Sequence, residues 1–203
     1  MGTSVDRSET ILGIIELAGG KLQGRTTLQK LAYFAAVEGI CDFKFRAHYY
    51  GPYSDEVAQT TSLLSALEAL HEDVVITGSQ TDLWLREVSG DVRTYTYSLT
   101  DQGREIVNNI HKEYPEQWVR LQQLVSTCQK ETNLSPGVLA TAAKVHFIYT
   151  HGPDAPGSNT SVEKAAAGFG WQLSEEDVTK VRHLLERIGI DVGVQVKPAA
   201  TPA

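Results

Sequence analysis

Histidine and cysteine side chains are the first candidates for chemistry in this chain of 203 residues. Cys41, Asp42 and His48 include the side-chain types of a Cys–His nucleophile pair. However, they fall on a predicted strand and the turn before it, and no nearby pattern specifies an oxyanion hole. His146 and His151 lie across a predicted helix end without a Glu or Cys partner, unlike the ligands of a zinc site. The sequence therefore predicts no catalytic residue and no metal ligand.

Motifs for cofactor binding are also missing from the sequence. Gly168 and Gly170 follow a predicted helix rather than a strand, which is the wrong context for a phosphate-binding loop. Cys41 and Cys128, the two cysteines of the chain, lack CxxC spacing and are expected to be reduced and partly buried. We therefore expect a protein that is not an enzyme and that uses no cofactor.

The remaining candidates suit binding rather than catalysis. Basic residues gather at the start of the predicted second helix and on the strand after it: Lys21, Arg25, Lys30, Lys44 and Arg46. An aromatic group follows, in which strand alternation places Tyr49 inward and leaves His48, Tyr50 and Tyr53 for the surface. Tyrosine and arginine are enriched where proteins meet. The predicted partner-binding residues are Arg25, Lys30, Arg46, His48, Tyr50 and Tyr53. A solvated basic face with tyrosines packed for structure is the alternative.

The charge of the chain argues against nucleic acid as the first choice of partner. The net charge is −7, with an isoelectric point near 5.4. The predicted third helix, within residues 54–73, contains five acidic residues and no Lys or Arg. Because phosphate contacts supply most of the affinity for DNA, an acidic third helix is a strong objection. DNA binding with Arg25, Lys30 and Arg46 on phosphates stays open as the alternative.

The N-terminal half reads as helices followed by strands. Apolar spacing predicts a helix from Ile11 to Ala18, a second after Gly24, and a third capped by Ser54. Leu63, Leu64, Leu67 and Leu70 form the expected buried stripe of the third helix. Alternation predicts a strand over residues 43–49, and two further strands over 83–88 and 92–99 flank a turn at 89–91. This order is close to that of a winged helix.

After Tyr114 the chain is predicted to be helical. Trp118, Leu121, Val125 and Cys128 make one stripe, and Val138, Ala142, Val145 and Tyr149 make another. Residues 152–160 read as a loop, Ser161 begins a short helix, and Ser174 with Asp177 caps a last helix. The predicted class is mainly α with a small antiparallel β part (α+β). A winged-helix-like domain spans 1–113, a helical domain 114–190 and a disordered tail 191–203.

Two segments carry a resemblance to known families. Residues 24–34, Gly-Arg-Thr-Thr-Leu-Gln-Lys-Leu-Ala-Tyr-Phe, and residues 48–54, His-Tyr-Tyr-Gly-Pro-Tyr-Ser, resemble the uncharacterised YwgA-like proteins of bacteria and archaea. More distantly, they resemble the Panacea domain of SocA-type antitoxins. The resemblance covers residues 8–72 well and the C-terminal part hardly at all. It implies action by protein contact, since Panacea antitoxins neutralise or deliver a toxin and are not enzymes.

The combined expectation is a regulatory or adaptor protein of antitoxin-like type. Its partner is expected to be another protein, with a toxin as one candidate and DNA as the alternative. No apolar run approaches the ~20 residues of a membrane helix, and the first nine residues do not form a secretory signal. The expected location is the cytoplasm of a prokaryote.

Overall fold

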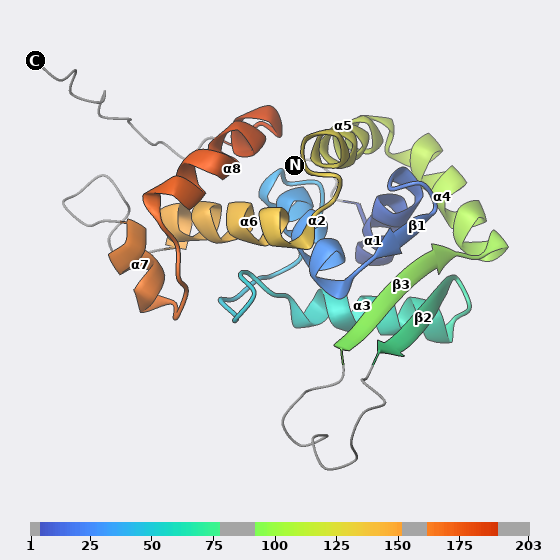
Figure 1. The fold of residues 1–203 in the computed structure, drawn as a ribbon. Coiled ribbons are helices and arrows are strands. Elements are labelled where there is room, and N and C mark those ends of the chain that lie inside the picture. The colour runs from blue at the N-terminus through green and yellow to red at the C-terminus, as the bar shows by residue number, and fades with distance from the viewer. Residues whose placement is uncertain (1–4, 78–91, 152–161, 191–203) are drawn as a thin grey trace, which may run out of the picture.

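The computed structural model describes residues 5–77, 92–151 and 162–190. Within these ranges the chain forms helices and three strands (Figure 1), in the order α1 (Arg7–Leu17), β1 (Lys21–Gln23), α2 (Arg25–Val37), α3 (Asp55–Ala66), β2 (Leu70–Thr77), β3 (Val92–Leu99), α4 (Asp101–Glu113), α5 (Pro115–Thr132), α6 (Pro136–His151), α7 (Val162–Gly168) and α8 (Glu175–Arg187). The structure is mainly helical with a small antiparallel sheet, as the predicted α+β class requires.

The sheet joins two parts of the chain that are far apart in sequence. Its described strands have the order β1-β3-β2, and both pairs are antiparallel. β3 is the central strand, with Leu22 opposite Tyr97 on one side and Leu70 opposite Leu99 on the other. All four side chains are buried, so this part of the sheet packs against the helices.

Helix starts follow the capping residues that the sequence indicated. Ser54 accepts a hydrogen bond from the Val57 amide, and Thr100 accepts one from the Gly103 amide. Ser174 and Asp177 form the predicted reciprocal capping box of α8. These side chains satisfy backbone donors that have no partner inside the helix, so they fix where each helix begins.

Several elements of the structure differ from the predicted ones. Residues 43–49 do not form a strand; only Arg46 makes an isolated bridge, to Tyr53. The β1 strand was not predicted, because three residues are too short to show alternation. The third helix ends earlier than expected: Leu63 and Leu67 are exposed, Glu68 adopts φ of 57°, and Leu70 lies in β2. The left-handed turn at Glu68 has no Gly or Pro to announce it.

The described buried residues form one hydrophobic cluster that runs from α1 to α8. Figure 1 shows α6 lying between α2 and α8, and contacts of α6 with both helices agree with this placement. α5 packs on α1, where a Cβ on Gly13 would meet Leu121 at 3.0 Å and Trp118 at 3.4 Å. The stripe of α5 is buried as predicted, whereas Val138 of the α6 stripe is 38% exposed. The domain boundary at 113/114 stays a prediction.

Several predicted features lie outside the described residues. They are the strand over 83–88, the turn at 89–91, the loop over 152–160, Ser161 and the tail 191–203. Among the helices that the structure does describe, none is both long and apolar enough to cross a membrane.

Candidate functional site

Two buried side chains of α2 hold the segment that precedes α3. The Gln29 amide donates from Nε2 to the Ser54 carbonyl at 2.9 Å, and its Oε1 accepts from the Ser54 backbone amide at 2.9 Å. Lys30 Nζ donates to the Pro52 carbonyl at 2.6 Å. Gln29 and Lys30, here called the anchor pair, therefore bind the backbone of residues 52–54 directly. These bonds explain why two adjacent polar residues occur in α2 between apolar, buried residues.

Lys30 does not belong to a basic surface. The residue is 2% exposed, because α2 and the segment around Pro52 enclose it. Burial, together with the positive charge of Lys144, lowers the pKa of Lys30 to about 7. The prediction that Lys30 contributes to a surface patch is therefore wrong. Its apolar stem and single carbonyl partner instead make it an internal support.

A second set of contacts holds the preceding residues, 48–51, from the C-terminal part of the chain. Trp171 Nε1 donates to the His48 carbonyl at 2.7 Å, and the Gly51 amide donates to that same carbonyl at 2.9 Å. Gly51 has φ of 93°, and a Cβ there would lie 3.0 Å from Lys144 Cγ. Both the left-handed backbone and the close approach favour glycine at this position.

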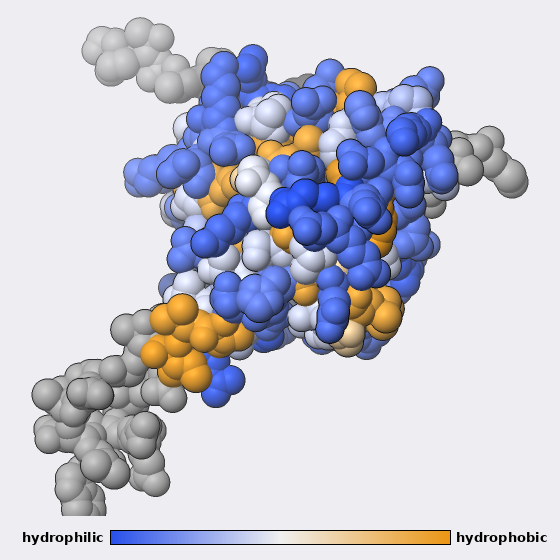
Figure 2. Space-filling model, turned by 90° about the vertical axis from the view of Figure 1, so that its right-hand side faces the viewer, coloured by the Kyte–Doolittle hydropathy of each residue, from blue (hydrophilic) through white to orange (hydrophobic). Residues whose placement is uncertain are grey.

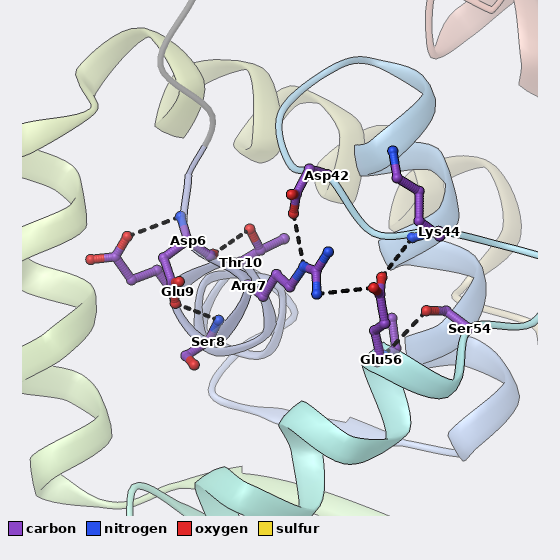
Figure 3. A network of polar contacts seen from close by, with 10 residues as sticks. Asp6, Arg7, Ser8, Glu9, Thr10, Asp42, Lys44, Ser54 and Glu56 are labelled. Carbon is purple, nitrogen blue, oxygen red and sulfur yellow. Dashed lines mark hydrogen bonds and ion pairs between the residues drawn. The ribbon is translucent and has the colours of Figure 1, made fainter.

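A polar network attaches the beginning of the segment to α1 and α3 (Figure 3). Arg7 pairs with Asp42 at 2.8 Å and with Glu56 at 3.0 Å, and Glu56 also accepts from the Lys44 backbone amide at 2.8 Å. The Arg7 guanidinium holds the pKa of the Asp42 carboxyl below its usual value, with Lys44 acting in the same direction. The segment over 42–54 is therefore held at its beginning by Arg7 and Glu56, in its middle by Trp171, and at its end by the anchor pair.

This support presents two aromatic rings to solvent. Tyr49 is 72% exposed and Tyr50 is 60% exposed, and their rings meet nearly at right angles with centroids 4.8 Å apart. The prediction that Tyr49 points inward is wrong. Its reason was strand alternation, and the backbone turns at residues 49–51 instead of continuing as a strand. Tyr49 thus joins the candidate site as a residue that sequence reasoning missed.

Tyr53, Arg46 and His48 lie together beside this turn. The Tyr53 ring is 5.1 Å from the His48 ring, and the Arg46 guanidinium carbon is 5.7 Å from the Tyr53 centroid. Arg46 also donates to both carboxylate oxygens of Asp55, at 3.1 and 3.2 Å. The charge of Arg46 is therefore locally balanced, and its planar group is positioned by two bonds.

Arg25 reaches the same region from the start of α2. Its guanidinium carbon lies 3.6 Å from the Tyr95 ring centroid, and Nη2 is 3.4 Å from Glu72. Arg25 and Tyr53 both line a cavity of about 210 Å³ between α2, α3 and the sheet. Arg25 and Tyr53 therefore border one cavity, although they come from different helix starts. We call Arg25, Arg46, His48, Tyr49, Tyr50 and Tyr53 the aromatic–basic face.

The anchor pair and Trp171 are the structural residues that the sequence did not assign. Gln29 and Lys30 adjoin buried Leu28 and Leu31, a position that favours burial, but only the folded chain reveals the carbonyls that they bind. Trp171 is separated from His48 by more than a hundred residues, and no local pattern connects them. A polar pair on an apolar helix face was the one available signal.

Other buried titratable groups are held in unreactive states. The Tyr33 hydroxyl lies 2.6 Å from His146 Nδ1, and burial lowers the pKa of His146 to about 4, which keeps its ring neutral. Burial raises the pKa of Cys41 to about 11 and that of Cys128 to about 12, so neither thiol is a thiolate at neutral pH. Within the described residues, no group of three His, Cys, Asp or Glu side chains is placed to hold a metal ion.

Comparison with known proteins gives one similarity and no activity. No family model matches the chain. The chain is 31% identical over 98 residues to the uncharacterised protein YwgA of Bacillus subtilis. The match covers 48% of this chain and spans about half, 52%, of that relative. This finding does not extend to the Panacea domain. It confirms the resemblance to YwgA-like proteins: over about half of its length the chain is similar to a protein of uncharacterised function.

Proposed function

We propose that the protein is a non-enzymatic regulatory or adaptor protein that binds another protein through the aromatic–basic face. The observation that carries this proposal is the pair of exposed rings, Tyr49 and Tyr50, on a segment that buried polar groups hold in place. Exposed tyrosines on a supported turn offer large contact area at low cost in side-chain entropy. A toxin is the candidate partner that the Panacea resemblance suggests.

The fixed backbone matters for affinity. Binding is weakened when a flexible loop must become ordered in the complex. Here the Gln29, Lys30 and Trp171 contacts order residues 48–54 in the free protein. An anchored turn with solvent-exposed aromatic rings is therefore better suited to recognition than to holding the fold together.

We also propose that the N-terminal part is a winged-helix-like domain. Its support is the order α1-β1-α2-α3-β2-β3 together with a sheet in the order β1-β3-β2. This fold favours DNA as a second candidate partner. Two of the three predicted phosphate contacts are weakened, however, because Lys30 is buried and Arg46 is paired with Asp55. α3 begins with Asp55 and Glu56, which would repel phosphate.

The test is binding by single variants. Arg25→Ala and Tyr53→Ala should each weaken binding of a partner purified from lysate of the source organism by more than about 1 kcal/mol. The fold should survive, because the Arg25–Glu72 pair is exposed and such pairs contribute about 0–1 kcal/mol. Arg104→Ala is the matched control, since Arg104 is similarly exposed and pairs with one carboxylate, Asp101.

Two results would overturn the proposal. One is a partner whose affinity per folded molecule is unchanged by both variants, with only the melting temperature lowered. The other is specific DNA binding in anisotropy assays at two salt concentrations, with a salt slope that falls by about one unit in Arg25→Ala. The second result would assign the protein to DNA-binding regulators instead.

A further inference from the structure

Arg25 also lines a second, basic groove that does not include Tyr53. It has a volume of about 690 Å³ and lies between the β1–α2 junction, the start of β3 and the turn that joins α5 to α6. Three of its described lining residues are cationic: Lys21, Arg25 and Arg93. No Asp or Glu occurs among its described lining residues. Arg25 also pairs with Glu72 at 3.4 Å, outside this lining, so Lys21 and Arg93 supply most of the positive charge of the groove in a chain with net charge −7.

The groove also contains a piece of sheet edge, at Arg93, that no described strand covers on the β1 side. β1 pairs with β3 only from Lys21 to Gln23, and the Gly24 amide then donates to the Tyr95 carbonyl at 2.8 Å. At Arg25 the chain turns into α2, so β1 does not extend alongside Arg93. Backbone groups of alternate residues point to the same edge of a strand, so those of Arg93 point to the edge that Tyr95 presents to Gly24. An extended segment placed there would continue the line of β1.

The surroundings of the groove add to its positive potential. Both α2 and α6 begin at its wall, and neither has an acidic residue in its first turn. The Thr27 hydroxyl donates to the Leu134 carbonyl at 3.4 Å, which connects the two walls. The cationic side chains carry most of the attraction, and the helix starts strengthen it over a short range.

We propose that this groove binds an extended acidic segment of the partner protein, added to the edge of β3 with its carboxylates on Lys21, Arg25 and Arg93. This inference rests on the proposed function and names the chemistry of the partner. Strand addition fits because the sheet edge supplies backbone hydrogen bonds while the cations select acidic side chains. A nucleic acid fits less well, because it has no peptide backbone to pair with the edge of β3.

The test uses the full chain and defined probes. A fluorescein-labelled peptide of alternating Glu and Thr should bind in an anisotropy titration, and the same peptide with Gln in place of Glu should bind at least about tenfold more weakly. The double variant Lys21→Gln/Arg93→Gln should lose about tenfold in affinity for the Glu peptide. Lys112→Gln/Arg104→Gln, which removes the same charges from α4, should bind as the wild type does. Backbone NMR shifts on binding should centre on residues 93–95.

Several other results would contradict this proposal. Equal binding of the Glu and Gln peptides, or shifts outside β3, would overturn the acidic-segment assignment. Tighter binding of a single-stranded oligonucleotide that competes with the peptide would assign the groove to nucleic acid. If Tyr53→Ala weakens partner binding but Lys21→Gln/Arg93→Gln does not, this inference fails while the proposed function stands. If Lys21→Gln/Arg93→Gln weakens partner binding and Tyr53→Ala does not, the aromatic–basic face is not the binding surface, and the groove is.

Discussion

Gln29 shows how one buried side chain can define a surface on the other side of the backbone. Its amide makes both a donor and an acceptor bond to Ser54, whose own hydroxyl caps α3. One residue of α2 thereby fixes the start of α3 and the end of the segment that carries the tyrosines. The cost of losing such a contact is large because the backbone groups of Ser54 are buried and would remain without partners.

Gln29→Leu should therefore lower the free energy of unfolding by about 2 kcal/mol or more, although it keeps the volume of the side chain. Chemical denaturation of both proteins measures this difference. Gln59→Leu is the control, since Gln59 is exposed on α3 and its replacement should change stability by less than about 0.5 kcal/mol. Equal effects of the two substitutions would show that the Gln29 contacts contribute nothing specific.

Lys30 gives a pH-dependent prediction. An unfolded lysine keeps its proton up to about pH 10.5, whereas the buried amine releases its proton near pH 7. Between these values the unfolded state binds more protons, so the free energy of unfolding should rise with pH. Lys30→Met should remove this rise, making the wild type gain roughly 3.5 kcal/mol relative to the variant between pH 7 and about pH 10. The loss of the donor to Pro52 is an offset that does not vary with pH. Parallel stability curves would contradict the prediction.

At the scale of elements, the sequence predicts what depends on local signals. Ser54, Thr100 and Ser174 each cap the helix assigned to them, because capping is a contact within one turn. The strand expected at 43–49 fails because Phe43 and Tyr49 satisfy alternation, but pairing needs a neighbour that sequence spacing does not reveal. The candidate site follows the same division. Arg25 was selected from its place at a helix start, whereas the burial of Lys30 depends on a distant carbonyl.

The junction of α4 with the α3–β2 turn offers a sharp test of packing between elements. A Cβ on Gly103 would lie 2.2 Å from the Ala69 carbonyl oxygen, which is backbone and cannot rotate away. Gly103→Ala should therefore destabilise the protein by about 2 kcal/mol or more, in spite of the higher helix propensity of alanine.

Gly137→Ala is the matched control for this prediction. Gly137 lies in the first turn of α6, and a Cβ there would meet no atom within 4 Å. The same substitution should leave stability unchanged or raise it by up to about 1 kcal/mol. Thermal melts of both variants decide the matter, and a Gly103→Ala protein as stable as the wild type would mean that α4 does not approach the turn this closely.

At the scale of the whole molecule, the C-terminal helices complete the N-terminal part. Trp118 and Leu121 of α5 cover Gly13 of α1, and His146 of α6 meets Tyr33 of α2. Trp171 then reaches back to His48 beside the candidate site. The aromatic–basic face belongs to the first 113 residues in sequence, yet its support comes partly from residues beyond them. This arrangement bears directly on the predicted domain boundary at 113/114.

We expect the two parts to unfold together. Leu121→Ala should remove a fully enclosed side chain, 2% exposed, and lower the free energy of unfolding by about 2–5 kcal/mol. Because the buried cluster is continuous, hydrogen exchange should accelerate in both β3 and α8, and a fragment of residues 1–113 should show no cooperative transition. Faster exchange confined to α5–α8, with β3 unchanged and the fragment folded, would show instead that 113/114 separates two independent domains. In that case the domain that contains Trp171 would fold independently of the site, and the hydrogen bond from Trp171 to His48 would be a contact between two domains.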